Sequence, residues 1–160
     1  MDYHYIFDRK VLFPIEYQTF KFTYSGKMDT LPVFPKEDLY IADCNDKEEL
    51  EGLGFFENDE VEQFINDPSI YIYRINGEYI ACGTFLKPYW RTDIPDSEKN
   101  SYRDIGMHVS PNHRYKGYGR SMVQNLTLIA LEQGFIPLTE CTVENTASRT
   151  ALESAGYVLQ

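Results

Sequence analysis

Cysteine is scarce in this sequence. The 160 residues include three, Cys44, Cys82 and Cys141, and their odd number and wide spacing do not form a disulfide framework. The disulfide-stapled class of small secreted domains is therefore excluded. Free thiols suit a reducing compartment, and we expect a cytoplasmic location.

Long apolar runs and an excess of basic residues are also missing. No apolar run reaches the roughly 20 residues of a membrane-spanning helix, and the first residues lack the basic and apolar regions of a signal peptide. With 15 basic and 25 acidic residues the net charge is −10, which argues against binding to nucleic acid or to anionic membranes. An acidic body instead attracts cations, such as an amine-bearing small molecule or peptide.

The composition that is present predicts a single domain over residues 1–160, with 42% hydrophobic and 25% charged residues. Apolar patterns predict one or two strands within residues 3–24, and further strands at 39–42, 70–75, 78–86, 102–109, 135–143 and 157–160. Helices are predicted up to Glu51, capped by Asn45 or Asp46; up to Asn66, capped by Asn58 or Asp59; from Tyr118 to Gly134; and from Asn145 to Gly156. This order predicts an α/β fold, a mixed sheet with helices on both faces.

A glycine loop lies between the strand at 102–109 and the helix that begins at Tyr118. Its spacing is Arg114-x-x-Gly117-x-Gly119, and loop amides at a helix N-terminus can hold a phosphate group. Residues 103–120 contain four cations and one acid, Asp104, so this window carries +3 in an acidic chain. Basic residues at a helix N-terminus oppose the helix dipole unless an anion binds there. The loop therefore predicts a phosphorylated cofactor, although an ordinary exposed turn is the simpler alternative.

Two familiar phosphate loops are excluded by the residues themselves. The sequence has no Gly-Lys-Ser/Thr of a nucleoside triphosphate loop, and no Gly-x-Gly-x-x-Gly followed by an acidic ribose ligand.

Two motifs resemble the GNAT N-acetyltransferase family. Val109-x-Pro111-x-x-Arg114-x-x-Gly117-Tyr118-Gly119-Arg120 is similar to its motif A, and Asn145-Thr146-Ala147-Ser148 followed by Gly156-Tyr157 is similar to its second cofactor helix. The resemblance covers about residues 57–160, and the hairpin at 70–86 fits two strands of the family. Residues 1–35 form an N-terminal extension of unassigned role.

The resemblance implies acetyl-CoA as cofactor. In this family the strands corresponding to 102–109 and 136–143 splay apart and receive the pantetheine arm, here along the main chain of Met107, His108 and Val109. The pyrophosphate is then expected at the loop and helix start, formed by Arg114, Tyr115, Lys116, Gly117, Tyr118, Gly119 and Arg120. Asn145 and Ser148 are expected to face the cofactor from the other side. Asn145 also suits a plain helix cap, and Ser148 an ordinary first-turn serine.

The implied reaction is direct transfer of an acetyl group to a primary amine of a small molecule or peptide. Many family members place a tyrosine seven residues after the motif asparagine, where this sequence has Leu152, and Arg103 stands at a position for an acidic base. Neither usual acid–base residue is therefore in register. Asp104, His108, Glu144 and Tyr157 are the nearest substitutes, and we take Asp104 and His108 as the catalytic candidates. A packed strand histidine is the alternative for His108.

Several alternatives stay open. The family adds one more strand after residues 157–160; here it is missing, replaced by the N-terminal segment, or donated by a partner in a homodimer. Cys141 could be a nucleophile, but a buried structural cysteine fits better. Asp104, His108 and His113 are poorly spaced for a metal, and none is expected. The rivals to an enzyme are a catalytically silent acyl-CoA-binding module and a protein that binds another nucleotide.

Overall fold

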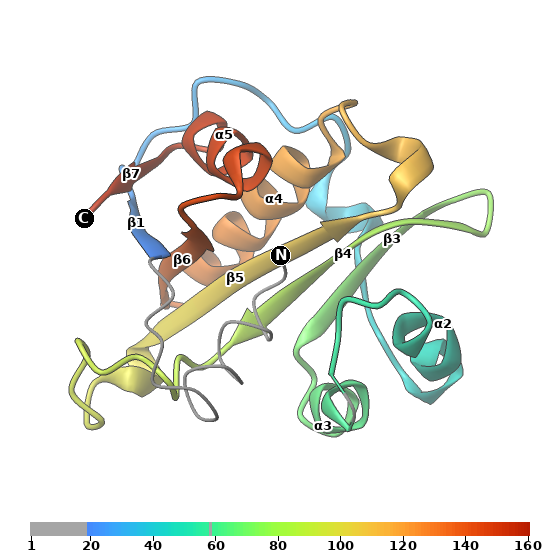
Figure 1. Ribbon diagram of the computed structural model, residues 1–160, viewed down its shortest axis with the longest axis horizontal. Coiled ribbons are helices and arrows are strands. Elements are labelled where there is room, and N and C mark those ends of the chain that lie inside the picture. Colours follow the sequence, from blue (N-terminus) through green and yellow to red (C-terminus); the bar gives the residue numbers. More distant parts are fainter. Residues whose placement is uncertain (1–18, 58) are drawn as a thin grey trace.

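The computed structural model describes residues 19–57 and 59–160, and in this part of the chain seven strands form one mixed sheet (Figure 1). Their order is β2-β3-β4-β5-β6-β1-β7. The strands are β1 (Thr19–Tyr24), β2 (Tyr40–Ile41), β3 (Ile70–Ile75), β4 (Glu78–Leu86), β5 (Tyr102–Val109), β6 (Ile136–Thr142) and β7 (Tyr157–Leu159). The helices are α2 (Lys47–Glu51), α3 (Glu60–Asn66), α4 (Tyr118–Glu132) and α5 (Thr146–Ser154). Helices cover both faces, so the predicted α/β fold class is confirmed.

The observed strands agree with the predicted ones most closely at β3, β4 and β5. β3 and β4 flank Asn76-Gly77, whose φ angles of 50° and 81° suit a type I′ turn. β4 pairs antiparallel with β5 from Leu86↔Asp104 to Ala81↔Val109. This pairing holds β5 along one edge as far as the residue that precedes the glycine loop.

The caps of the two short helices differ from the prediction. Neither Asp46, at the start of α2, nor Asp59, at the start of α3, makes a side-chain cap hydrogen bond. Asp43 is the capping residue, because a 3-10 turn at Cys44–Asp46 precedes α2 and moves the cap one turn earlier. Asn58 and the predicted strand residues before 19 lie outside the described residues.

The N-terminal strand β1 lies inside the sheet. It pairs antiparallel with β6, from Thr19↔Thr142 to Thr23↔Leu138, and antiparallel with β7 on its other edge. Phe22 of β1 is fully buried. Residues from near the two ends of the described chain therefore complete the same half of the sheet, as Figure 1 shows on the left.

Residues 30–34 connect β1 toward β2 and run across α4. Three polar side chains of the helix hold this connection through its main chain. The Val33 N–H donates to Ser121 Oγ (2.8 Å), while Gln124 Nε2 donates to the Thr30 oxygen (2.8 Å) and Asn125 Nδ2 to the Phe34 oxygen (3.0 Å). These contacts explain why α4 buries polar residues beside its predicted apolar stripe.

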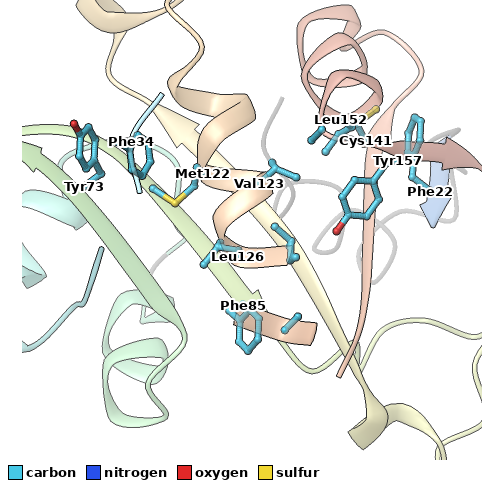
Figure 2. Packing of buried hydrophobic residues seen from close by; sticks show 14 of the residues in the cluster. Phe22, Phe34, Tyr73, Phe85, Met122, Val123, Leu126, Cys141, Leu152 and Tyr157 are labelled. Carbon is cyan, nitrogen blue, oxygen red and sulfur yellow. The ribbon is translucent and has the colours of Figure 1, made fainter. Parts of the chain in front are cut away.

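Two apolar clusters form the core, one on each face of the sheet. The larger lies between the sheet and helices α4 and α5, where Met122, Val123 and Leu126 of α4 pack against the strands (Figure 2). The smaller joins α2 and α3 to β3 and β4 and includes Leu50, Val61 and Cys82. The sheet is therefore supported from both sides where β4 and β5 lead to the glycine loop.

Gly156 is expected to be intolerant of a side chain. Its φ is 97°, a Cβ there would overlap the carbonyl oxygen of Lys27, and its own oxygen accepts the Ser25 N–H at 2.8 Å. Gly156→Ala should lower the free energy of unfolding by about 3 kcal/mol or more, because left-handed strain and overpacking add. Urea denaturation measures this loss.

Gly134→Ala is the matched control. Gly134 has a φ of 81° with no atom within 4 Å of an added Cβ, so only the backbone strain of about 1–2 kcal/mol should appear. Equal losses in the two variants would contradict the proposed contact with Lys27.

Candidate functional site

Strands β5 and β6 diverge, as the family resemblance implied. Their parallel pairing covers only Tyr102↔Ile136, Arg103↔Pro137 and Asp104↔Leu138. Beyond it, β5 continues along β4 and β6 continues along β1. One bond still spans the gap, from Thr139 Oγ1 to the Ile105 oxygen (2.8 Å). Within the described residues, β6 therefore offers no ladder partner to the main chain of Met107, His108 and Val109.

A cleft of about 750 Å³ lies at this end of β5. Its walls come from β5, the glycine loop, one face of α5 and the loop after α2. All residues predicted to bind the cofactor line it except Lys116. The lining residues are Leu53, Gly54, Phe55, Met107, His108, Val109, His113, Arg114, Tyr115, Gly117, Tyr118, Gly119, Arg120, Asn145, Ala147, Ser148, Thr150, Ala151 and Ser154.

The glycine loop leaves the start of α4 without a side-chain cap. Gly117 is the N-cap residue, with a φ of 86°, and it offers no side-chain acceptor to the first-turn amides. Amides at an uncapped helix start are donors that an anion can satisfy. Tyr115 in the same loop has a φ of 63° and a side chain that is 97% exposed. The loop therefore contains two turn residues with positive φ near the helix start, Tyr115 and Gly117, and both line the cleft.

Gly119 lets the first turn of α4 lie directly on β5. A Cβ at Gly119 would come within 3.3 Å of both Met107 Sδ and Val109 Cγ2. Because those residues form the open edge of β5, this close contact brings the helix start and the strand edge together in one cleft.

The cations of the loop form no ion pairs with acids in the described part of the chain. Arg114 Nε donates to the Val109 oxygen (3.2 Å), but no ion pair within residues 19–57 and 59–160 involves Arg114, Lys116 or Arg120. Arg120 Nε is buried and has no hydrogen-bond partner there. In a chain of net charge −10, such a group of unpaired cations indicates an anion site.

The opposite wall comes from α5. Asn145 Oδ1 accepts the Ser148 N–H at 3.0 Å, which is the helix cap that the sequence predicted as one role of Asn145. Both residues also line the cleft, together with Ala147 and Ala151. The cap therefore fixes the end of α5 that faces the glycine loop.

The two catalytic candidates lie in different places. His108 lines the cleft, and its Nδ1 lies 2.9 Å from the hydroxyl of Tyr79. Asp104 is 1% exposed, does not line the cleft, and lies near Tyr157. The structure therefore brings His108, and not Asp104, to the predicted cofactor residues.

The other proton-transfer substitutes also lie away from the cleft wall. Burial raises the pKa of Tyr157, whose hydroxyl lies 2.7 Å from Thr127 Oγ1. Glu144 is exposed and is not a lining residue. Arg103, at the family's position for an acidic base, places its guanidinium carbon 3.7 Å from the centre of the Phe135 ring.

Sequence reasoning missed part of the cleft wall. Residues 53–55, in the loop between α2 and α3, also line it, and nothing in their local sequence signals this long-range contact. The α5 residues Ala147, Thr150, Ala151 and Ser154 recur at helical spacing on the face of Ser148, so that face could have been found by periodicity.

Two findings bear on metals and membranes. Within residues 19–57 and 59–160, no group of three or more His, Cys, Asp or Glu residues is placed to hold a metal ion. None of the helices in the described ranges combines the length and apolar character needed to cross a membrane.

The thiol of Cys141 is a poor nucleophile. Cys141 is buried, and burial raises its pKa to about 11, so little thiolate exists near neutral pH. Treatment of the native protein with iodoacetamide at pH 8 should alkylate exposed Cys44 and spare Cys82 and Cys141. Mass spectrometry of the peptides checks this, and the same reaction in denaturant should label all three. Fast labelling of native Cys141 would contradict its assigned burial.

A family model described as the acetyltransferase (GNAT) family matches residues 35–157. A search of curated protein sequences finds no match to the chain. Among solved structures, a GNAT-family acetyltransferase from Colwellia psychrerythraea superposes with a TM-score of 0.73 at 19% identity, over 90% of this chain and 53% of that one. This chain therefore spans about half the length of that protein, and 61% of the next, from Novosphingobium aromaticivorans.

Two further solved structures carry ligands. YncA of Salmonella typhimurium, with its cofactor acetyl-CoA, has a TM-score of 0.61 at 19% identity, over 74% of this chain and 77% of that one. AAC(6′)-Ib, in complex with paromomycin and acetyl-CoA, has a TM-score of 0.63 at 19% identity, over 76% and 82%. At such identities these likenesses concern the fold, whereas the family model covers most of the sequence. The chain belongs to the GNAT acetyltransferase family.

Proposed function

We propose that this protein is an acetyl-CoA-dependent N-acetyltransferase that transfers an acetyl group to a primary amine by direct attack. The observation that carries the proposal is the continuous cleft from the open edge of β5 to the uncapped start of α4. One end offers an edge of β5 that has no ladder pairing with β6 within the described residues, and the other end offers amide donors and cations.

The residues present fit coenzyme A in both halves of the cleft. At the loop end, the amides of residues 114–119 and the cations Arg114 and Arg120 would hold the diphosphate. At the strand end, the main chain of Met107, His108 and Val109 would pair with the amide groups of the pantetheine arm, as a missing strand would. Asn145 and Ser148 would close the other side. The ligands of YncA and AAC(6′)-Ib support this proposal.

When bound, acetyl-CoA supplies a thioester carbon that an amine can attack and a thiolate that leaves. The Met107 N–H is a donor placed to stabilise negative charge on the carbonyl oxygen. His108 would accept the proton of the attacking nitrogen, because it is the catalytic candidate that reaches the cleft. A C–N bond forms, the C–S bond breaks, and the proton passes to the imidazole. With Leu152 in place of the usual tyrosine, the thiolate would leave without a tyrosine donor; a thiol pKa of about 8.5 makes it a good leaving group.

The acceptor is a primary amine of a small molecule or peptide. A net charge of −10 raises the local concentration of cationic amines around the protein. AAC(6′)-Ib, a protein of similar fold, is in complex with paromomycin, which supports an amine acceptor.

Cofactor binding is tested by thermal unfolding with acetyl-CoA, CoA and ATP. A ligand at a hundred times its Kd should stabilise the protein by about 2.7 kcal/mol. Arg120→Gln should weaken CoA binding by about tenfold to a hundredfold, because a charge-assisted contact of about 1.5–3 kcal/mol is lost. Lys47→Gln is the matched control, because it removes an exposed cation that is paired with Glu51 and Glu62. It should leave the affinity for CoA unchanged. Preference for ATP would contradict the cofactor assignment.

Turnover is tested by thiol release from acetyl-CoA with a panel of amines, including an aminoglycoside, a polyamine and a peptide. His108→Gln should lower kcat by roughly a hundredfold or more, in the range of general-base catalysis, while CoA affinity stays unchanged. Unchanged kcat in this variant would remove His108 from the reaction. Binding of CoA, with no thiol released from acetyl-CoA in the presence of any amine of the panel, would favour a catalytically silent module.

A further inference from the structure

The side chains at the end of β5 divide the cleft between the two faces of the sheet. Met107 and Val109 face α4, because a Cβ added to Gly119 would lie 3.3 Å from each of them. His108 lies between them and points to the other face, where its partner Cys82 packs in the cluster of α2 and α3. These two helices lie opposite α4 and α5 (Figure 1). With the diphosphate proposed at the start of α4, the acceptor would approach from the α2 and α3 face.

The cleft wall on that face comes from the loop between α2 and α3. Leu53, Gly54 and Phe55 line the cleft, and the Phe55 ring lies 5.3 Å from the imidazole of His108, measured between centroids. Phe56 packs edge-on against Phe55 at 4.9 Å, and Leu53 is partly exposed and packs on the same apolar cluster. A Cβ added to Gly54 would meet no atom within 4 Å. The wall is therefore apolar, with open space beside it.

The charge of the cleft lining is unsuited to a polycation. None of the described residues that line the cleft is Asp or Glu. An amine has to lose a proton before its nitrogen can attack, and a monoamine then carries no charge, whereas a diamine keeps one. That remaining charge would lose water against Leu53 and Phe55 without gaining a carboxylate partner. A hydrocarbon group in the same place gains from leaving water.

The acids of the chain lie around this face and not in the lining. Residues 36–67, which include α2, α3 and the loop between them, contain twelve acids and two cations, so their net charge of −10 equals that of the whole chain. Such a field attracts cations before they make contact. An amine with one ammonium group is therefore drawn to the mouth of the cleft in its charged form, although the wall inside favours its apolar part.

We propose that the acceptor is a primary monoamine with an aromatic or branched aliphatic body, which packs on Leu53 and Phe55 while its nitrogen lies at the thioester. This inference rests on the proposed function, because it names the substrate class of the same reaction. The chemistry is unchanged: a C–N bond forms, the C–S bond breaks, and the nitrogen gives its proton to the proposed base. Polyamines and aminoglycosides are poor acceptors under this assignment.

The acceptor class is tested by thiol release from acetyl-CoA with three amines. Pentylamine and putrescine have nearly the same size, and differ in that a methyl group of the first replaces the second ammonium group of the other. We expect kcat/KM to be about tenfold or more higher for pentylamine, because no second charge is buried, and at least as high for phenethylamine. An equal or higher value for putrescine overturns this inference alone. Thiol release with none of the three, nor with any amine of the broader panel, overturns the proposed function.

Leu53→Glu tests the assigned contact, because it places a carboxylate in the wall. It should lower kcat/KM for pentylamine about tenfold and raise that for putrescine, while CoA affinity stays unchanged. Leu131→Glu is the matched control, since Leu131 is a 47% exposed residue of α4 outside the lining and the variant adds the same charge. It should keep the wild-type ratio of the two values. An unchanged ratio in Leu53→Glu overturns the contact.

Leu53→Gln keeps the test available if thermal unfolding shows that Leu53→Glu does not fold. The amide is polar but uncharged, so kcat/KM for pentylamine should fall by about threefold to tenfold with no gain for putrescine. Wild-type values for both amines in Leu53→Gln likewise overturn the role of Leu53.

Discussion

The parallel pairing of β5 and β6 stops after residues 104 and 138, and the rest of the site depends on that early end. Because β4 holds one edge of β5 and β1 holds one edge of β6, the two strands are fixed apart instead of closing the gap. The edge of β5 at residues 107–109 then lines the cleft instead of pairing with β6. Gly119 brings the helix start onto the same strand, so strand edge and helix amides meet in one cleft.

Electrostatics and packing at the site support each other. The uncapped start of α4 and the unpaired Arg120 form a region that is unfavourable on its own, since positive charges face the positive end of a helix. The folded chain tolerates this because the connection at 30–34 holds the helix through Ser121, Gln124 and Asn125. Helix position is thus fixed by neutral hydrogen bonds, and the charges remain available to a ligand.

Local signals in the sequence were enough for the hairpin at Asn76-Gly77, the strand at 102–109 and the glycine loop, because each depends on turn chemistry or on alternation within a few residues. The proposed cofactor residues followed instead from the resemblance to the family motifs, and all of them except Lys116 line the cleft. Local signals were not enough for Phe55 and Tyr79, which reach His108 only through the long-range packing of α2, α3 and the hairpin. Asp104 and His108 lie four residues apart in β5, so alternation along the strand does not distinguish them. Asp104 lies near the start of the strand and is buried, whereas His108 lies near its end and lines the cleft.

Strand β1 has a consequence for how the chain is made. It comes early in the sequence, whereas its two neighbours in the sheet, β6 and β7, are synthesised much later. Until then β1 has no edge to pair with, and the ladder that keeps β6 away from β5 does not exist. Contacts between distant parts of a chain form slowly, so we expect the glycine loop to form before the gap between β5 and β6 beside it.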